Sequence, residues 1–415
     1  MQRVDGFGVG RVPLTFDAAM FNVTRTLPLL FIAVALAVNT SQASDCDSTP
    51  CDACLDFETY TGTASRWSVQ GQYLMWWTNG ADSPALVTTS DPASLRSEAG
   101  VIGNPTTEVL YGNDSPNSEM RNGVRLSIGR PISDRWNFYG EGLYVGDAGD
   151  PFRQFSSGQP ILARPYVSAQ TGLNDSELVA FPNVLEGAIS VETESRLFGF
   201  EIGASSVFSE DKDTRISIFT GYRFIQFEDS LGVQEDLESI DLGGVVPLGT
   251  TFRVNDSFEA KNQFHGVNLR LEIEKQLNRW DLVFQPSLAL GSMERTVSTA
   301  GTTRTQIPGL DPTFVDGGLL AQPTNIGQDT SSVFTVLPEF RFSLGREVLS
   351  GLRFDVGYSF LLLPKTFRAA EQIDPNLNAS QIGGGALVGP GAPAVARNES
   401  HLWNQSITFS VALQR

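Results

Sequence analysis

Cysteine is almost absent from the body of this 415-residue chain, which excludes a disulfide-stabilised scaffold there. Cys46, Cys51 and Cys54 lie close together, and none of the residues after Cys54 is a cysteine. Asp45 stands before Cys46, where a lipoprotein signal requires a small residue, so we do not expect lipid attachment. Cys51 and Cys54 are candidates for a small disulfide in an oxidising compartment, whereas a zinc site would need a fourth ligand that this segment lacks.

Positive charge is also scarce. The chain has 29 Lys and Arg residues against 47 Asp and Glu residues, a formal net charge of -18. Such a surface repels nucleic acid, so we expect no nucleic-acid partner. The acidic residues 235–238 and Asp241 match no regular calcium-binding loop, and we interpret them as solvated surface. No metal ion and no cofactor are expected.

Long apolar runs are limited to residues 27–38, a stretch too short to cross a bilayer as a helix but typical of a signal peptide. Arg25 precedes the run, and Ser41 and Ala43 follow it at the two positions that signal peptidase reads. We therefore predict export. The expected leader is residues 1–43, with Met20 as the true start, followed by a Cys-containing periplasmic tail over residues 44–65 and one domain over residues 66–415.

The sequence is rich in segments that alternate apolar with polar or small residues, the period of two that indicates β-strands. In residues 264–274, for example, Val267 and Leu269 alternate with Arg270 and Glu272. No comparable helical period follows the leader. The ten segments are residues 66–77, 121–130, 136–145, 188–208, 214–227, 264–274, 280–290, 334–344, 352–362 and 403–413.

The links between these segments distinguish a membrane barrel from a water-soluble sandwich, which alternates too. Short links (131–135, 209–213, 275–279, 345–351) alternate strictly with long gaps (78–120, 146–187, 228–263, 291–333, 363–402). In an up-and-down barrel, every second link lies on the same rim. We therefore predict an all-β fold: one antiparallel, up-and-down transmembrane β-barrel of about ten strands. Five long extracellular loops, short periplasmic turns and periplasmic termini follow from this topology.

Tryptophan gives an independent indication of a membrane barrel. All six tryptophans lie within a residue or two of the end of a predicted strand, whereas a sandwich core would place them in mid-strand. Indole is amphipathic and favours the boundary between lipid and water. We therefore predict two aromatic girdles, made of Trp67, Trp136 and Trp280 at the periplasmic end and Trp76, Trp77 and Trp403 at the outer end.

Charged residues on the polar faces of the strands are expected to point into the lumen. The acidic ones are Glu141, Glu201, Glu272, Glu274, Glu339 and Asp355, and the basic ones are Arg125, Arg215, Arg223, Arg270, Arg341 and Arg353. The two sets are equal in number, and unpaired charge in a narrow barrel would be costly. An interior ion-pair network is therefore favoured over a conducting, charge-lined pore.

Several motifs, in order along the chain, make the sequence resemble the family of putative β-barrel porins, type seven. They are YLMWWT at 73–78 with LVTTS at 86–90, PILARPY at 160–166, LVAFP at 178–182, DSFE at 256–259 with NQFHG at 262–266, and GGLL at 317–320 with NIG at 325–327. The resemblance covers essentially the whole mature chain. It implies a bacterial outer-membrane barrel, and the family's name implies a pore, with no catalytic residues to carry over.

The resulting expectation is a porin-like narrow channel for small solutes or a structural component of the envelope. The alternative is a non-conducting barrel whose long external loops serve as an adhesion or interaction surface. Catalysis is least favoured, because an enzyme would have to rely on His265 and His401 near the outer rim, and the chain has no Gly-x-Ser-x-Gly, His-Glu-x-x-His or phosphate-loop motif.

The expected partners are outer-membrane lipids, periplasmic chaperones and the outer-membrane insertion machinery. That machinery often recognises an aromatic residue at the C-terminus of its substrates, whereas here Leu413 is followed by Gln414 and Arg415. Its recognition of this chain is a weaker expectation for that reason.

Overall fold

The computed structural model describes residues 67–113, 120–133, 135–149 and 151–414. The predicted leader, its cleavage site and the tail with Cys51 and Cys54 lie outside these residues. In the described part, no helix is long and apolar enough to cross a membrane.

The fold is all-β, as predicted. Its strands are β1 Ser68–Thr78, β2 Val87–Ser90, β3 Thr107–Tyr111, β4 Arg121–Pro131, β5 Asn137–Ala148, β6 Phe152–Ser156, β7 Ile161–Ser168, β8 Asn174–Ala180, β9 Leu185–Glu210, β10 Thr214–Ser239, β11 Thr251–Leu277, β12 Trp280–Gln306, β13 Thr313–Asp316, β14 Gly327–Leu349, β15 Leu352–Thr366, β16 Asn376–Leu377 and β17 Ser400–Gln414, with short 3₁₀ helices η1 Ala370–Gln372 and η2 Ala379–Gly384.

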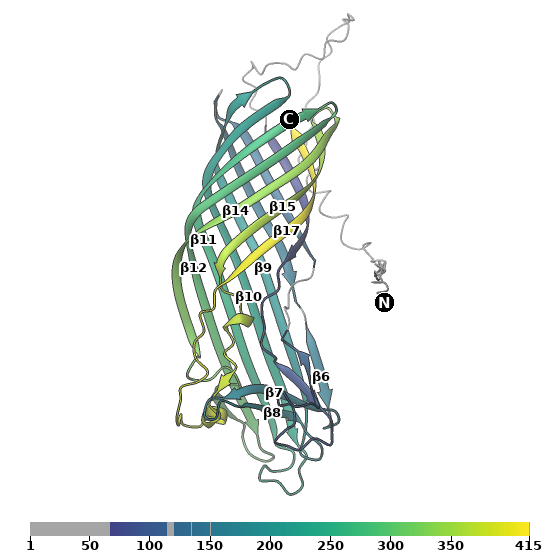
Figure 1. Cartoon of the computed structure of the whole chain (residues 1–415), viewed down its shortest axis with the longest axis vertical. Helices are drawn as coiled ribbons and strands as arrows, with labels where there is room; N and C mark the ends of the chain where they lie inside the picture. The colour runs from purple at the N-terminus through teal and green to yellow at the C-terminus, as the bar shows by residue number, and fades with distance from the viewer. Residues whose placement is uncertain (1–66, 114–119, 134, 150, 415) are drawn as a thin grey trace, which may run out of the picture. The chain divides into compact units, whose positions relative to one another are not determined.

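Antiparallel pairing closes the large sheet into a ring (Figure 1). The order of paired strands is β1, β4, β5, β9, β10, β11, β12, β14, β15 and β17, and β17 pairs back onto β1 from Ser68↔Gln414 to Thr78↔Asn404. Because both edges of every ring strand are occupied over part of its length, the backbone N–H and C=O groups find their partners within the sheet. Each of the ten alternating segments of the sequence overlaps a strand of this ring.

The strands are longer than the alternation of apolar residues predicted. The predicted loop 228–263 is mostly strand, because β10 continues to Ser239 and β11 begins at Thr251, which leaves residues 240–250 as the loop. The physical reason is a change of the apolar face. On β10, Ile218 and Tyr222 are exposed, whereas further along the same strand it is Leu231 and Val233 that are buried. The period of two persists, but the apolar side switches from the outer face to the inner face.

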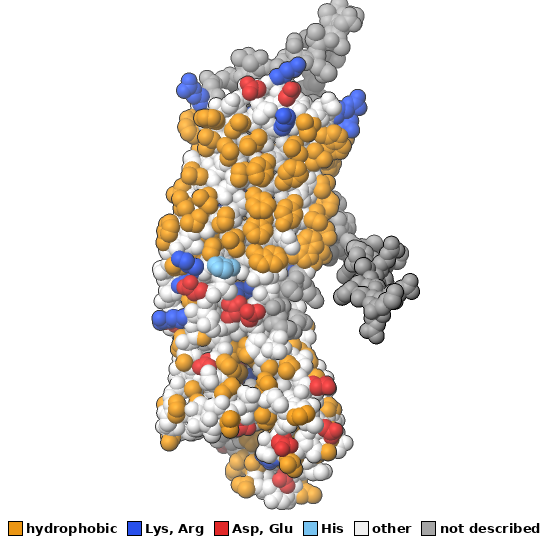
Figure 2. Space-filling model, in the orientation of Figure 1, with side chains coloured by type: hydrophobic (Ala, Val, Ile, Leu, Met, Phe, Trp, Pro, Cys, Tyr) orange, Lys and Arg blue, Asp and Glu red, His pale blue; other side chains and the backbone are white. Residues whose placement is uncertain are grey.

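The same inversion occurs on the neighbouring strands. On β11, Val267 and Leu269 are exposed while Phe258 is buried, and on β12, Leu288 is exposed while Val297 is buried. On the face that Figure 2 shows, the result is a band of apolar side chains over one part of the ring, with a mostly polar surface beyond it. The outer face of the ring is therefore apolar in one zone and polar in the other.

Segments that the sequence assigned to loops form a second sheet. Its order is β16, β7, β2 and β3, with β8 pairing onto β7, and β16 runs parallel to β7. In Figure 1, β7 and β8 lie at the end of the ring where the strands extend beyond the apolar band. Buried side chains of this sheet, such as Leu162 and Val179, join Leu231 and Phe258 of the ring strands in one apolar cluster, which we call the outer core. This end of the ring, which we call the outer end, is thus a two-layered sandwich.

We expect Phe258→Ala to lower the free energy of unfolding by about 3–5 kcal/mol, because it removes a fully buried ring from the outer core and leaves a cavity. Denaturant unfolding of the detergent-solubilised protein measures this. The matched control is Phe314→Ala on β13, where the ring is 69% exposed and little stability is at stake. Equal losses in the two variants would contradict the assignment of Phe258 to a packed core.

Candidate functional site

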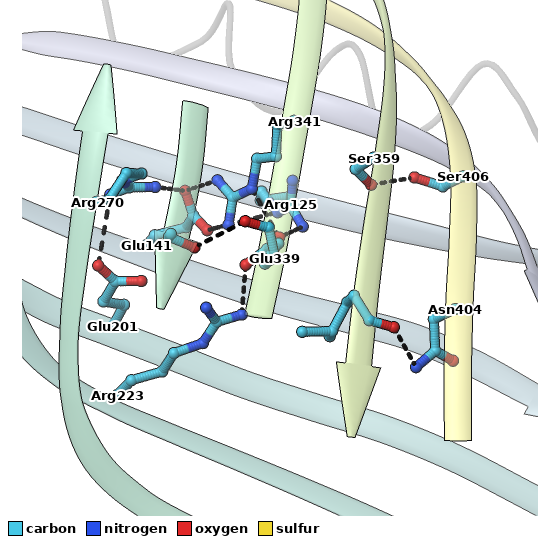
Figure 3. Close-up of polar contacts among 12 residues, drawn as sticks. Arg125, Glu141, Glu201, Arg223, Arg270, Glu339, Arg341, Ser359, Asn404 and Ser406 are labelled. Atoms are coloured by element: carbon cyan, nitrogen blue, oxygen red, sulfur yellow. Dashed lines mark hydrogen bonds and ion pairs between the residues drawn. The ribbon is translucent and has the colours of Figure 1, made fainter. Parts of the chain in front are cut away.

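Seven of the predicted lumen charges meet in one network that crosses the interior of the ring (Figure 3). We call it the ionic layer. It consists of four arginines, from β4, β10, β11 and β14, and three glutamates, from β5, β9 and β14: Arg125, Arg223, Arg270 and Arg341 with Glu141, Glu201 and Glu339.

Glu339 on β14 is the centre of the ionic layer. Its Oε1 accepts hydrogen bonds from Arg125 Nη2 at 3.2 Å and from Arg341 Nε at 2.7 Å. Its Oε2 accepts one from Arg223 Nη2 at 2.5 Å. Arg125 belongs to β4 and Arg223 to β10, neither of which pairs with β14. The carboxylate of Glu339 therefore joins separate parts of the wall across the lumen.

Glu141 and Glu201 extend the ionic layer toward β11. Glu141 accepts two hydrogen bonds from Arg341, at 2.5 and 2.8 Å, and lies 3.5 Å from both Arg125 and Arg270. Glu201 lies 3.5 Å from Arg270 and accepts a hydrogen bond from the hydroxyl of Tyr139. The guanidinium of Arg270 also stacks 4.7 Å from the ring centroid of Phe219. The sequence did not identify the aromatic partners, because their proximity arises only when the ring closes.

The ionic layer fills the lumen at its level. Its side chains are at most 11% exposed, so the charges have lost nearly all contact with water. Removing charge from water is costly, and only mutual pairing with good hydrogen bonds offsets that cost. Each carboxylate here faces between two and four charged or hydroxyl donors. This geometry is that of a cross-linked interior plug.

The remaining predicted lumen charges lie outside the ionic layer. Arg353 pairs with Asp355 at 2.7 Å, with Glu274 at 2.9 Å and with Asp281, which the sequence had not singled out, at 3.4 Å. Glu272 accepts a hydrogen bond from Gln285. Arg215 is exposed near the start of β10, on the same face of the strand as Arg223, and its charge acts on Glu272.

An apolar layer lies next to the ionic layer, toward the outer end. Along β10 the order is Arg223, then Ile225 and Phe227, then the outer core residue Leu231. The layer also contains Leu74, Trp76, Leu143, Val145, Leu197, Phe264, Ala289, Met293, Leu337, Leu361, Leu363 and Leu402.

The prediction that Trp76 belongs to a lipid-facing girdle is wrong. Trp76 is 1% exposed, packs inside the ring and donates its Nε1–H to Asn404 Oδ1 at 3.3 Å. Strand parity explains this, because successive residues of a strand point to opposite faces of the sheet. Trp76 points into the ring, and Trp77 therefore points to the outer face. Trp67, Trp136, Trp280 and Trp403 are exposed near strand ends, as expected for girdle positions, and Trp77 is half-buried.

A second buried charge cluster lies in the outer core, and the sequence did not predict it. Glu235, which we had interpreted as solvated surface, is fully buried on β10 and pairs with Arg164 of β7 at 2.6 Å. Arg164 also pairs with Asp256 of β11 at 2.8 Å. The inward parity of Glu235 continues along β10, which extends to Ser239, beyond the predicted strand over residues 214–227.

The sequence profile of the putative beta barrel porin-7 (BBP7) family matches residues 68–414, nearly all of the described chain. The chain belongs to this family. The resemblance found in the sequence is thereby confirmed, and the protein is a β-barrel of the BBP7 family. No curated protein matches this BBP7 chain significantly in sequence.

Solved structures of outer-membrane proteins resemble this BBP7 barrel at very low identity. The outer membrane protease OmpT from Escherichia coli is 8% identical, with a TM-score of 0.41 over 86% of this chain and 99% of that chain. The Pseudomonas putida toluene transporter TodX is 9% identical, with a TM-score of 0.23 over 85% and 90%. A Pseudomonas aeruginosa FadL homologue is 8% identical, with a TM-score of 0.26 over 84% and 90%.

The segments that carry the family resemblance meet in the outer core. Arg164 comes from PILARPY and Asp256 from DSFE, and the two form an ion pair. Asp256 in turn accepts hydrogen bonds from the backbone N–H groups of Leu319, Leu320 and Ala321 in and after GGLL. Residues far apart in this BBP7 sequence thus build one buried polar cluster.

The two histidines lie in different surroundings. His265 Nδ1 is 2.6 Å from the hydroxyl of Tyr222, and its ring centroid is 5.0 Å from that of Phe224. The backbone oxygen of His401 accepts a hydrogen bond from Asn79. Among the residues described, no group of three or more His, Cys, Asp or Glu side chains is arranged to hold a metal ion.

We expect Glu339→Gln to lower the free energy of unfolding by about 3–5 kcal/mol, because Arg125, Arg223 and Arg341 lose their shared carboxylate while staying buried. Urea unfolding in detergent measures the effect. The control is Glu192→Gln, whose pair with Arg153 at 3.7 Å is exposed to water and should change stability by about 1 kcal/mol or less. If the two variants unfold at the same urea concentration, the ionic layer does not hold the barrel together.

Proposed function

We propose that this protein spans the bacterial outer membrane as a ten-stranded, up-and-down barrel with a filled interior. In this proposal it is a non-conducting scaffold, and the sandwich at its extracellular end serves as an interaction surface. The observation that carries the proposal is the packing of buried side chains inside the ring at three successive levels: the ionic layer, the apolar layer and the outer core.

Membrane insertion is supported by the inversion of the apolar face along single strands. Where Leu269 and Leu288 point outward they are exposed, whereas Phe258 and Val297 on the same strands are buried inside. Exposed apolar side chains around a whole ring are stable only if the outer medium is apolar. The band in Figure 2 therefore marks the hydrocarbon zone, and the polar zone beyond it stands in water.

The orientation follows from the links between ring strands. The short links 132–136, 211–213, 278–279 and 350–351 lie at the same end of the ring as Ser68 and Gln414. In outer-membrane barrels the short turns face the periplasm and the long connections face outward. We therefore place the outer core and the second sheet outside the cell, with the ring delivered by periplasmic chaperones and the insertion machinery.

The filled interior favours an interaction scaffold over a channel for small solutes. A path along the lumen would have to pass Arg125 and Glu339, then Trp76 and Phe227, and all four side chains are buried. A conducting pore needs a continuous aqueous route. The ordered second sheet at the outer end, in contrast, offers a stable surface to other molecules.

Single-channel recording in planar bilayers tests the absence of conduction. We expect no conductance steps from the purified protein at neutral pH, because packed side chains occlude the lumen at three levels. An open porin reconstituted by the same procedure is the positive control. Regular steps of one amplitude, proportional to the amount of protein, would refute the non-conducting scaffold and restore the channel interpretation.

Membrane insertion has a separate test on β11. We expect Leu269→Arg to cost about 2–4 kcal/mol of folding free energy in lipid vesicles, because it places a charge on the lipid-facing side of the band. Ser257→Arg is the matched control, since Ser257 lies on the same strand and the same outward face but beyond the band. Similar folding of both variants would contradict the position of the hydrocarbon zone.

A further inference from the structure

The hairpin of β7 and β8 closes the outer end of the ring from inside. Leu162 of β7 and Val179 of β8 are fully buried in the outer core, together with Leu231 of β10 and Phe258 of β11. The only side-chain ion pairs shown between this hairpin and the ring strands, within the described residues, are those of Arg164 with Glu235 and with Asp256. Arg164 is thus the electrostatic anchor of the hairpin.

A third carboxyl group faces this anchor. Glu177 of β8 stands directly opposite Arg164 in the strand register. Its Oε2 and the Oε2 of Glu235 are buried and have no hydrogen-bond partner within the described structure. Asp256 is already committed to the N–H groups of Leu319, Leu320 and Ala321, at 3.3, 3.2 and 2.9 Å. One guanidinium therefore serves three carboxyl groups in a buried space.

This imbalance of charge is relieved by a proton. Burial and the charge of Glu235 raise the pKa of Glu177 to about 8, although Arg164 acts in the opposite direction and Asp256 adds to the rise. Burial also raises the pKa of Glu235. The other titratable groups of the hairpin face each other, since the hydroxyl of Tyr166 donates to Asp175 Oδ2 at 3.1 Å.

We propose that Glu177 is a proton-binding site that controls the docking of the β7–β8 hairpin. While Glu177 is protonated, the cluster contains Arg164, two carboxylates and one neutral carboxyl group, and the hairpin is docked. When Glu177 loses its proton, a third carboxylate is buried beside a single cation, and the hairpin loosens from the ring. The ionic layer lies deeper in the lumen, so this behaviour does not depend on whether the barrel conducts.

The direction of the pH effect follows from linkage. The pKa of Glu177 is about 8 in the docked hairpin, against an ordinary value of 4.5 in water. The docked state therefore binds the proton more tightly than the open state does. The resulting advantage, a stabilisation of the docked hairpin, is fully present below about pH 4.5. The advantage falls as the pH rises through the window from about 4.5 to about 8 and is lost above it. The hairpin is held more firmly in acid than in alkali.

The test uses the full chain with Cys46, Cys51 and Cys54 replaced by Ser and with Val179→Cys as a buried reporter on β8. A charged, water-soluble maleimide modifies the reporter only when the hairpin opens. The rate is measured from pH 6 to pH 9 with Glu177 present and with Glu177→Gln. The intrinsic reactivity of the thiol is the same in both proteins. The rate with Glu177 divided by the rate with Glu177→Gln therefore reports docking alone.

We expect this ratio to rise about tenfold or more between pH 6 and pH 9, because Gln cannot ionise and keeps the hairpin docked. Glu238→Gln is the matched control, since Glu238 is an exposed acid near the end of β10, and it should behave like the parent protein. A ratio that stays constant with pH would overturn the proposal, and so would an equal change with Glu238→Gln.

A second measurement covers the case in which the reporter variant does not fold. Hydrogen exchange of the β7 and β8 amides is compared at pH 9 between the unmodified chain and Glu177→Gln, so the intrinsic exchange rates cancel. We expect about tenfold slower exchange in Glu177→Gln. Equal exchange in the two proteins would overturn the proposal.

Discussion

Pairing of β17 with β1 closes the antiparallel sheet on itself, and this closure governs where every side chain of the wall can point. A sheet with free edges would leave unpaired backbone groups, which are costly in an apolar medium. Here β17 pairs with β1 over the whole length of β1, and β9 pairs with β10 from Ser239↔Leu185 to Arg215↔Glu210. Once the wall is continuous, each side chain of a ring strand must point either outward or into a narrow interior.

That narrow interior determines the chemistry of the inward residues. Charges can be kept there only if they neutralise one another, and Glu339 does so for Arg125, Arg223 and Arg341 at once. Toward the outer end, apolar residues such as Phe227 and Phe264 fill the same space without needing partners. The family name emphasises a pore, whereas the described interior of this member is packed.

Beyond the apolar band, the ring becomes a sandwich. β5 ends at Ala148, and β6 takes its place beside β9, while β13 pairs with the far end of β12. The extended strands β9 to β12 form one layer, and the second sheet forms the other. A polar outer surface and an apolar inner face are what a water-exposed sandwich requires. One strand can therefore belong to two environments, provided that its apolar side changes where the surrounding medium changes.

The all-β fold, the ten alternating segments and the residues of the ionic layer could be predicted from the amino-acid sequence, because alternation is a local property that each strand displays alone. It failed at Trp76 and Glu235, which were placed on the outside. Their true positions depend on strand parity beyond the point where the apolar face inverts. The meeting of Arg164, Glu235 and Asp256 could not be predicted, since they come from three strands separated by long stretches of chain. Such meetings are fixed by ring closure and by packing across the lumen, and no short-range pattern records them.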